Sequence, residues 1–233
     1  MVNAKIVLQP GASRSIGARL AASWFTIFVL FYGLWVGLPF LAPVFMHLNW
    51  SGAGKAIYFI YSVFCHQLPE RSFFLFGQKS MYSIKEINSV WKNTLNPMIL
   101  RQFIGGESMG WKVAWSDRMV SFYTSIWLFA VAWFPLRKKT KSLSFLGFAL
   151  FLLPIALDGG THLISDFAGI DQGFRDTNQW LAILTNNSLP ATFYVGDAIG
   201  SFNSFMRLIT GLLAGLGISW LVFPYLEESL GKN

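Results

Sequence analysis

The sequence predicts an all-α, polytopic integral membrane protein, and three observations support that prediction. Of the 233 residues, 54% are hydrophobic, 17% are aromatic and only 12% are charged, which is far from the composition of an average soluble domain. Several apolar stretches approach the roughly 20 residues that a helix needs to cross the hydrocarbon core of a bilayer. The net charge of +7 comes from basic residues beside these stretches and not from a separate basic module. We therefore expect a single membrane domain over residues 1–233 and no binding of nucleic acid.

Four segments are predicted to span the membrane. Pairs of glycines four residues apart occur in the first and last segments, where they let a neighbouring helix approach closely. The third segment is short unless its helix continues through Gly159 and Gly160. The predicted spans cover residues 21–46, 119–136, 143–157 and 208–226.

A fifth apolar segment, residues 56–76, is interrupted by polar residues from Cys65 onward. Its nine or ten continuous apolar residues do not cross the ~30 Å of hydrocarbon. We expect a re-entrant or interfacial helix here, and the alternative is a fifth span. A re-entrant segment would itself imply a polar vestibule, because non-helical backbone at membrane depth must be covered by protein or line a wet cavity.

Basic residues in short loops predict the orientation, because such loops stay in the cytoplasm. The densest basic loop covers residues 137–141, and three more basic residues precede the first span: Lys5, Arg14 and Arg19. With four crossings, both termini are then cytoplasmic in an inner, cytoplasmic-type cell membrane. Two extramembrane segments, residues 78–118 and 158–207, would lie on the outer side, whereas a fifth span would leave the 137–141 loop outside.

The segment of residues 78–118 is moderately polar and is expected to lie on the membrane interface. Short helices are predicted around residues 84–91 and after the turn at Asn96-Pro97, with a break at Gly105-Gly106. Tryptophans along it favour contact with lipid headgroups or with another subunit.

The first chemically suggestive stretch contains Cys65, His66, Gln67 and Arg71. Cys65 and His66 are adjacent, so on a helix they point about 100° apart and do not form a nucleophile–base pair by themselves. In one interpretation Cys65 is a small buried residue, His66 and Gln67 end a helix and Arg71 lies at headgroup level. In the other, His66 is a ligand or proton carrier, because an ionisable group near membrane depth is costly.

The second stretch places Asp158, His162 and Asp166 at intervals of four, so that they share one face of a helix. Two carboxylates and an imidazole suit a divalent cation of the zinc or manganese type, with His66 as a fourth ligand. The alternative is that the two glycines after Asp158 end the helix and leave the carboxylates solvated.

A third polar run contains Arg175 and Asn178. With Arg71, Arg118 and Arg207 on the same side, the arginines could grip an anionic or phosphorylated lipid headgroup, or pair with the nearby carboxylates. The complete candidate site comprises Cys65, His66, Gln67, Arg71, Arg118, Asp158, His162, Asp166, Arg175 and Asn178.

The run Cys65-His66-Gln67-x-Pro69-Glu70-Arg71-Ser72-Phe73, with Asp158-Gly159-Gly160 and Arg175-Asp176-Thr177-Asn178, resembles an uncharacterised bacterial and archaeal family of predicted membrane proteins. The resemblance covers most of the chain after Tyr58. It implies a Cys-x-x-Cys type motif before the middle helix, but the matching positions here are Ser116 to Met119, so both thiols are missing. The family has no established activity.

Two functional hypotheses follow. The chain is expected to be a non-catalytic accessory subunit of a larger membrane complex, in contact with lipids and with other membrane subunits or further copies of itself. The alternative is a membrane-surface enzyme or binding protein that acts on a lipid-linked or amphipathic substrate. Its site would be centred on His66, Asp158 and His162 and could include a divalent metal ion. Glycine-rich phosphate loops, G-x-S-x-G elbows and H-E-x-x-H pairs are absent from the sequence.

Overall fold

The computed structural model describes residue 17 and residues 22–230. Lys5, Arg14 and Arg19, on which part of the predicted orientation rests, lie outside the described residues. Within the described part, four helices are long and apolar enough to cross a membrane: α2 (Trp24–His47), α6 (Asp117–Trp133, continued by the 3-10 turn η2, Phe134–Leu136), α7 (Phe145–Asp166) and α11 (Phe202–Leu230).

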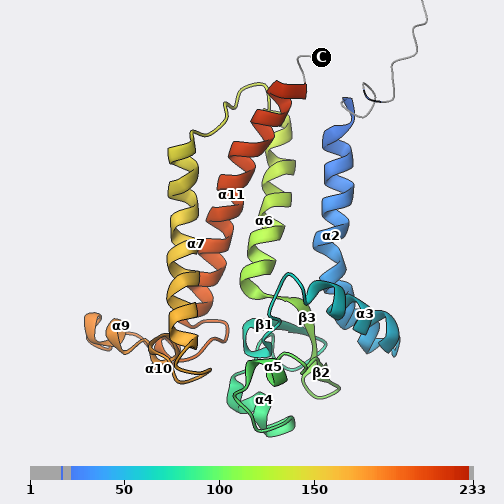
Figure 1. Ribbon diagram of the computed structural model, residues 1–233. Helices are drawn as coiled ribbons and strands as arrows, with labels where there is room; N and C mark the ends of the chain where they lie inside the picture. The colour runs from blue at the N-terminus through green and yellow to red at the C-terminus, as the bar shows by residue number, and fades with distance from the viewer. Residues whose placement is uncertain (1–16, 18–21, 231–233) are drawn as a thin grey trace, which may run out of the picture.

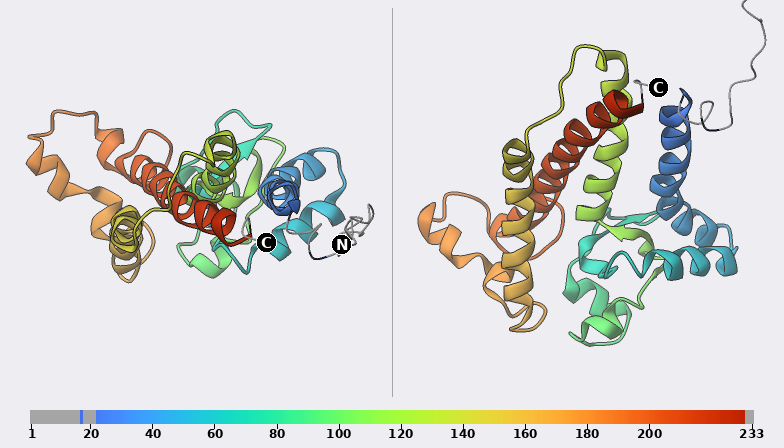
Figure 2. Two further views of the ribbon diagram at one scale, coloured as in Figure 1. Left: turned by 90° about the horizontal axis from the view of Figure 1, so that it is seen from above. Right: turned by 45° about the horizontal axis from the view of Figure 1, so that its top comes forward.

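The four long helices stand side by side in the order α7, α11, α6, α2; the neighbours α6 and α11 run in the same direction, and the outer helices α2 and α7 run the opposite way (Figures 1 and 2). α11 packs most extensively against α6 and then against α7, while α2 has a smaller contact with α6. A membrane bundle with four spanning helices, as expected from the composition, is therefore confirmed.

Two glycines allow α11 to lie close against α6. A Cβ atom at Gly211 would come within 3.0 Å of the Arg118 carbonyl oxygen, and one at Gly215 within 2.9 Å of the Phe122 carbonyl oxygen. Because backbone atoms cannot rotate away as a side chain does, these positions require glycine for this helix separation.

Helix α7 is longer than its predicted span. It continues through Gly159 and Gly160 to Asp166, so the two glycines do not end it. The intrahelical hydrogen bonds tolerate glycine at a cost of roughly 1 kcal/mol per residue, which tertiary contacts can offset. The register of residues 158, 162 and 166 on one helical face is therefore kept.

The fifth apolar segment does not span. Its helix is α3 (Ser51–Tyr61), which lies crosswise at the end of α2 (Figure 1). Beyond Tyr61 the chain leaves the helix and reaches the 3-10 turn η1 (Pro69–Arg71). The prediction that this segment is not a fifth span is thus confirmed, but its helix begins earlier and is shorter than the predicted segment, and its place at the membrane interface stays a prediction.

A small antiparallel sheet, which the sequence did not predict, lies at the same end of the bundle. Its strands are β1 (Ser72–Leu75), β2 (Gly105–Gly106) and β3 (Gly110–Ser116), in the order β1-β3-β2. β3 leads directly into α6, and Trp115 on it is fully buried against α2 and α3. The sheet therefore fixes where α6 begins.

The connections around the sheet are short helices. α4 (Ile84–Val90) begins with a capping box between Ser83 and Glu86, and α5 (Pro97–Leu100) follows the predicted turn. On the other side of the same end lie α8 (Phe174–Thr177), α9 (Gln179–Leu184) and α10 (Ala191–Tyr194) (Figure 1).

Both polar stretches therefore meet at one end of the bundle. The basic loop of residues 137–141 lies between α6 and α7 at the opposite end, where α2 begins and α11 ends (Figure 1). This arrangement follows from four crossings, because each polar stretch joins a helix that arrives at this end to one that leaves it.

Candidate functional site: a buried charge network and its cavity

Arg207, in the first turns of α11, is the centre of the buried charges. Its Nε donates to both carboxylate oxygens of Asp117, at 2.8 and 2.9 Å. Its Nη1 donates to Asp197 Oδ1 and its Nη2 to the Asp197 carbonyl oxygen. Arg207 is 2% exposed and Asp117 is fully buried, so this ion pair joins the beginnings of α6 and α11 away from water.

Arg71, at the end of η1, makes the second link. Its Nη1 and Nη2 donate to the two carboxylate oxygens of Asp166, each at 2.8 Å, and its Nε donates to Asp197 at 2.9 Å. Burial acts to raise the pKa of Asp197, but the Arg71 and Arg207 guanidiniums hold it well below its usual range. Asp197 is therefore ionised and connects the first polar stretch to the second.

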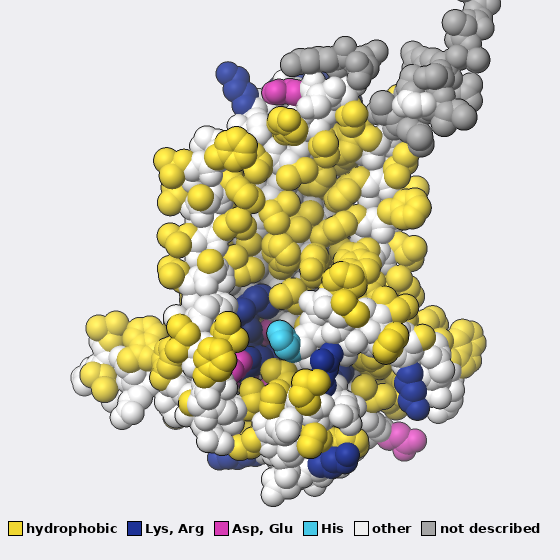
Figure 3. All heavy atoms as spheres, viewed as in Figure 1, with side chains coloured by type: hydrophobic (Ala, Val, Ile, Leu, Met, Phe, Trp, Pro, Cys, Tyr) yellow, Lys and Arg dark blue, Asp and Glu magenta, His cyan; other side chains and the backbone are white. Residues whose placement is uncertain are grey.

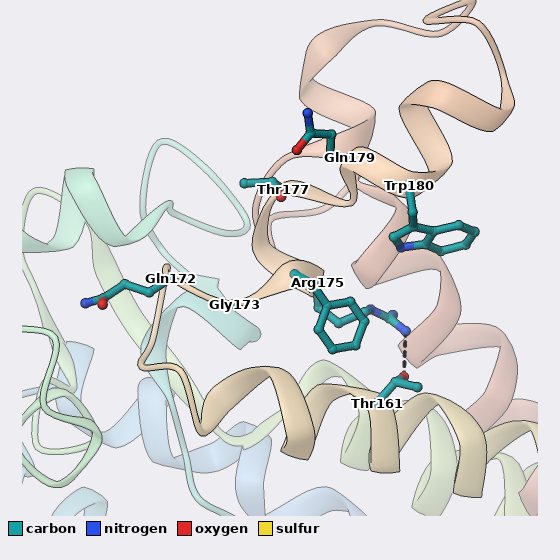
Figure 4. A pocket seen from close by; sticks show the side chains of 8 residues that line it. Thr161, Gln172, Gly173, Arg175, Thr177, Gln179 and Trp180 are labelled. Carbon is teal, nitrogen blue, oxygen red and sulfur yellow. Dashed lines mark hydrogen bonds between the residues drawn. The ribbon is translucent and has the colours of Figure 1, made fainter.

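Asp158, on α7, is held between two arginines. Arg118 Nη2 donates to its Oδ2 and Arg175 Nη2 to its Oδ1, both at 2.7 Å. Figure 4 shows Arg175 reaching from α8 to Thr161 of α7, where its Nη1 donates to the hydroxyl at 2.8 Å. This contact lies in an open hollow of about 590 Å³ that Trp180 also lines.

Two buried asparagines hold Arg175 in place. Its Nε donates to Asn203 Oδ1 at 3.1 Å, and Asn203 in turn donates to the Arg175 carbonyl oxygen. Asn178 has φ of 41° and donates to the carbonyl oxygens of Arg175 and Tyr194. Asparagine tolerates this left-handed conformation better than most residues, so Asn178 has a structural role in the turn between α8 and α9.

The predicted stretch around Cys65 is held by backbone contacts. Cys65 Sγ accepts from the backbone N–H groups of Gln67 and Ser116. Gln67, with φ of 53°, donates through Nε2 to the Tyr58 carbonyl oxygen. His66 between them is exposed. The thiol therefore serves as a buried acceptor that fastens this loop to β3.

Lys112 on β3 is fully buried and lies beside this loop. Its Nζ donates to the carbonyl oxygens of Gln67 at 2.6 Å and Arg101 at 2.8 Å. Burial lowers its pKa to about 7. Because of this burial, the Lys112 amine is uncharged at moderately alkaline pH.

Glu70 is a buried acidic side chain whose oxygens accept no hydrogen bond among the described residues. It is 3% exposed, and both carboxylate oxygens are buried without a partner. Burial raises its pKa to about 7, although the positive charges of Arg71 and Lys112 oppose the shift. Its side chain lines a small pocket of about 160 Å³ together with Asp176 and Asp197.

A cavity of about 480 Å³ joins the two polar stretches. Figure 3 shows basic, acidic and histidine side chains gathered in a hollow directly below the hydrophobic side chains of the long helices. The charge network consists of four arginines and four aspartates: Arg71, Arg118, Arg175, Arg207, Asp117, Asp158, Asp166 and Asp197. All of these arginines except Arg175 line the cavity, but Asp166 is the only one of these aspartates that does. Its other lining residues include Phe64, Cys65, His66, Gln67, Ser116, Met119, His162, Leu163 and Phe167.

Two buried nitrogen atoms of cavity-lining residues have no partner among the described residues: Arg118 Nε and His162 Nδ1. His162 Nε2 lies 3.2 Å from Arg175 Nη2. Because a guanidinium only donates, Nε2 must accept, and the imidazole proton is assigned to Nδ1. Both unpartnered atoms are therefore N–H donors.

The predicted metal ligands are only partly brought together. Asp158, His162 and Asp166 share a face of α7, but both oxygens of each carboxylate accept from guanidiniums. Among the described residues, no three His, Cys, Asp or Glu side chains are grouped so as to hold a metal ion. Metal binding stays a prediction.

Several residues of the network were missed by the sequence reasoning: Asp117, Asp197, Glu70 and Lys112. Their signal was the rarity of charge in this chain, because a charged residue close to a span is costly and requires a partner. Ser116 and Met119, where the resemblance places the family's thiols, line the same cavity as Cys65.

The fold and the buried charges define a multi-pass membrane protein with one polar end. The family model described as predicted membrane protein (DUF2085) matches residues 102–221, so the chain belongs to that family. An uncharacterized protein of Methanocaldococcus jannaschii is 26% identical over 200 residues, which cover 83% of this chain and 86% of the relative. No solved structure matches the chain. The resemblance to an uncharacterised membrane protein family is thus confirmed.

Replacing Arg207 should destabilise the protein strongly. Arg207→Met leaves Asp117 buried without its guanidinium and removes one of the two guanidiniums of Asp197, and breaking a buried pair in this way costs about 3–5 kcal/mol. Thermal unfolding in detergent should shift far down, whereas Lys79→Met, which removes an exposed ion pair with Glu86, should change little. Equal effects of the two substitutions would contradict the network's role.

Glu70→Gln should change how stability depends on pH. The pKa of Glu70 is raised from 4.5 to about 7, so the folded state binds this proton more tightly, and stability falls as the pH rises from about 4.5 through 7. Above pH 7 the variant should be more stable than the natural protein, by on the order of 3 kcal/mol. Unfolding midpoints across this range test this, with exposed Glu228→Gln as the control; parallel curves for natural protein and Glu70→Gln would refute it.

Proposed function

We propose that this protein is a membrane-surface binding protein for an amphipathic molecule, whose polar head enters the cavity at the end of the bundle. The observation that carries this proposal is the composition of the cavity wall. Charged and polar groups of both polar stretches line it together with apolar side chains such as Phe64, Leu163 and Phe167. Such a mixture fits a ligand that is polar at one end and apolar at the other.

The position of the cavity supports the same proposal. Leu163 and Phe167, at the end of α7, are 59% and 81% exposed and border the cavity. In a membrane these side chains would lie near the boundary between hydrocarbon and headgroups, so a ligand could enter sideways from the bilayer. Its apolar tail would stay among the lipid chains.

We also infer that the cavity faces away from the cytoplasm. The basic loop of residues 137–141 lies at the opposite end of the bundle, and basic loops of this length remain in the cytoplasm. Both ends of the described chain, at α2 and α11, would then be cytoplasmic in an inner cell membrane.

The orientation can be tested with an impermeant thiol reagent on intact cells. Cys65 is buried and serves as the background, while Lys79→Cys and Lys138→Cys place exposed thiols at the two ends. Lys79→Cys should be labelled before lysis and Lys138→Cys only after it. The reverse pattern would invert the proposed orientation.

Filling the cavity should expel its ligand. Leu163→Trp adds bulk at the cavity wall, and Leu153→Trp adds the same bulk to an exposed position of α7 outside the lining. Native mass spectrometry after gentle extraction should find a small amphipathic molecule on the natural protein and on Leu153→Trp, but several-fold less on Leu163→Trp. Equal occupancy on the two variants, or none on the natural protein, would count against the proposed function.

The accessory-subunit hypothesis has support of a different kind. The apolar window of α7 is only 11% buried and that of α2 only 22%, so much of both helices is available to lipid or to another membrane subunit. The same native mass spectra decide this: a partner chain retained in stoichiometric amount would favour it, and a stable monomer would not.

A further inference from the structure

The cavity presents donors that lack acceptors. Arg118 and His162 both line this cavity, and Arg118 Nε–H and His162 Nδ1–H are buried without a partner among the described residues. An N–H group buried without an acceptor is destabilising, so a pair of them in one cavity calls for a ligand that accepts.

The nearby acidic acceptors are already used. Both oxygens of Asp158 accept from Arg118 and Arg175, and both oxygens of Asp166 accept from Arg71. Each of these oxygens could accept a second hydrogen bond, but neither free donor is within hydrogen-bonding geometry of one. As the described side chains are placed, an acceptor for the two donors would have to come from outside them.

The charge of the cavity wall favours an anion. Three guanidiniums line it, those of Arg71, Arg118 and Arg207, against the single carboxylate of Asp166. The other three network aspartates are buried behind the wall, so the network can be neutral as a whole while its cavity side is positive. An incoming anion meets positive charge and N–H donors first.

We propose that the cavity binds a phosphate-type oxyanion through Arg118 Nε–H and His162 Nδ1–H, an inference that rests on the proposed function by assigning the polar head of its amphipathic ligand. A tetrahedral oxyanion offers several acceptor oxygens at once, and guanidiniums bind such groups with charge-assisted hydrogen bonds. His162 contributes as a neutral donor whose proton is kept on Nδ1 by Arg175.

The test compares three probes on the full chain in maltoside micelles: an alkyl monophosphate, the alcohol of the same chain length, and inorganic phosphate. The alkyl phosphate should bind at least tenfold more tightly than the alcohol, which is the loss expected for one charge-assisted hydrogen bond. In protein labelled with ¹⁵N-histidine, it should shift the His162 Nδ1 resonance while Nε2 remains without a proton.

Arg118→Lys is the decisive variant, because lysine keeps a positive charge beside Asp158 but has no Nε–H. It should weaken binding of the alkyl phosphate about tenfold or more, whereas Arg137→Lys, at the other end of the bundle, should leave it unchanged. His162→Phe, which keeps a ring without a donor, should weaken binding in the same way. Unfolding temperatures of all variants establish that they are folded.

The outcomes separate the inference from the proposed function. Equal binding of alcohol and alkyl phosphate, unaffected by Arg118→Lys, would overturn the oxyanion site and leave the amphiphile-binding function standing. Binding of inorganic phosphate with the same Arg118 dependence, but no gain from the alkyl chain, would support the oxyanion site and overturn the proposed function. Failure of all three probes to bind would overturn both.

Discussion

The buried pairing of four arginines with four aspartates is the constraint on which the rest of the structure depends. Arg207 joins the beginnings of α6 and α11, Arg71 joins η1 to the end of α7, and Asp158 is shared between Arg118 and Arg175. Removing Arg207 would leave Asp117 unpaired, and removing Asp158 would leave Arg118 and Arg175 unpaired, at low dielectric, where an isolated ion is several kcal/mol less stable than in water. The pairing therefore fixes how the helix ends and the extramembrane loops sit relative to one another.

The same pairing shapes the cavity. Because the carboxylates are directed at the guanidiniums, the cavity is lined by three arginines and His162 but by only one aspartate of the network, Asp166. The tautomer of His162 is itself a product of the network, since Arg175 donates to its other nitrogen. The charge network and the proposed ligand-binding surface share the same arginines, so stability and binding have to be measured separately in every variant.

The sequence predicted the spans, because a run of about twenty apolar residues is recognisable without any periodic pattern. It predicted that the two polar stretches meet, because two crossings separate them and return the chain to the same side. It did not predict the sheet, whose strands are short and whose Gly105-Gly106 pair was interpreted as a break. The extension of α7 through Gly159 and Gly160 was left open, since propensity alone argues against it and tertiary contacts decide. Arg71, Arg118 and Arg175 were candidates, as were Asp158 and Asp166, but the pairing of Arg207 with Asp117 and Asp197 was found only in three dimensions.

Composition and charge placement by themselves determined that this chain is a four-helix membrane protein with two polar stretches gathered at one end, because hydrocarbon excludes charge wherever in the fold it occurs. The tertiary structure alone decided which arginine pairs with which aspartate, that Glu70 and Lys112 are buried, and that Arg118 and His162 keep free donors. These depend on distances between residues up to 126 positions apart, as for Arg71 and Asp197, and no local pattern in the sequence encodes them.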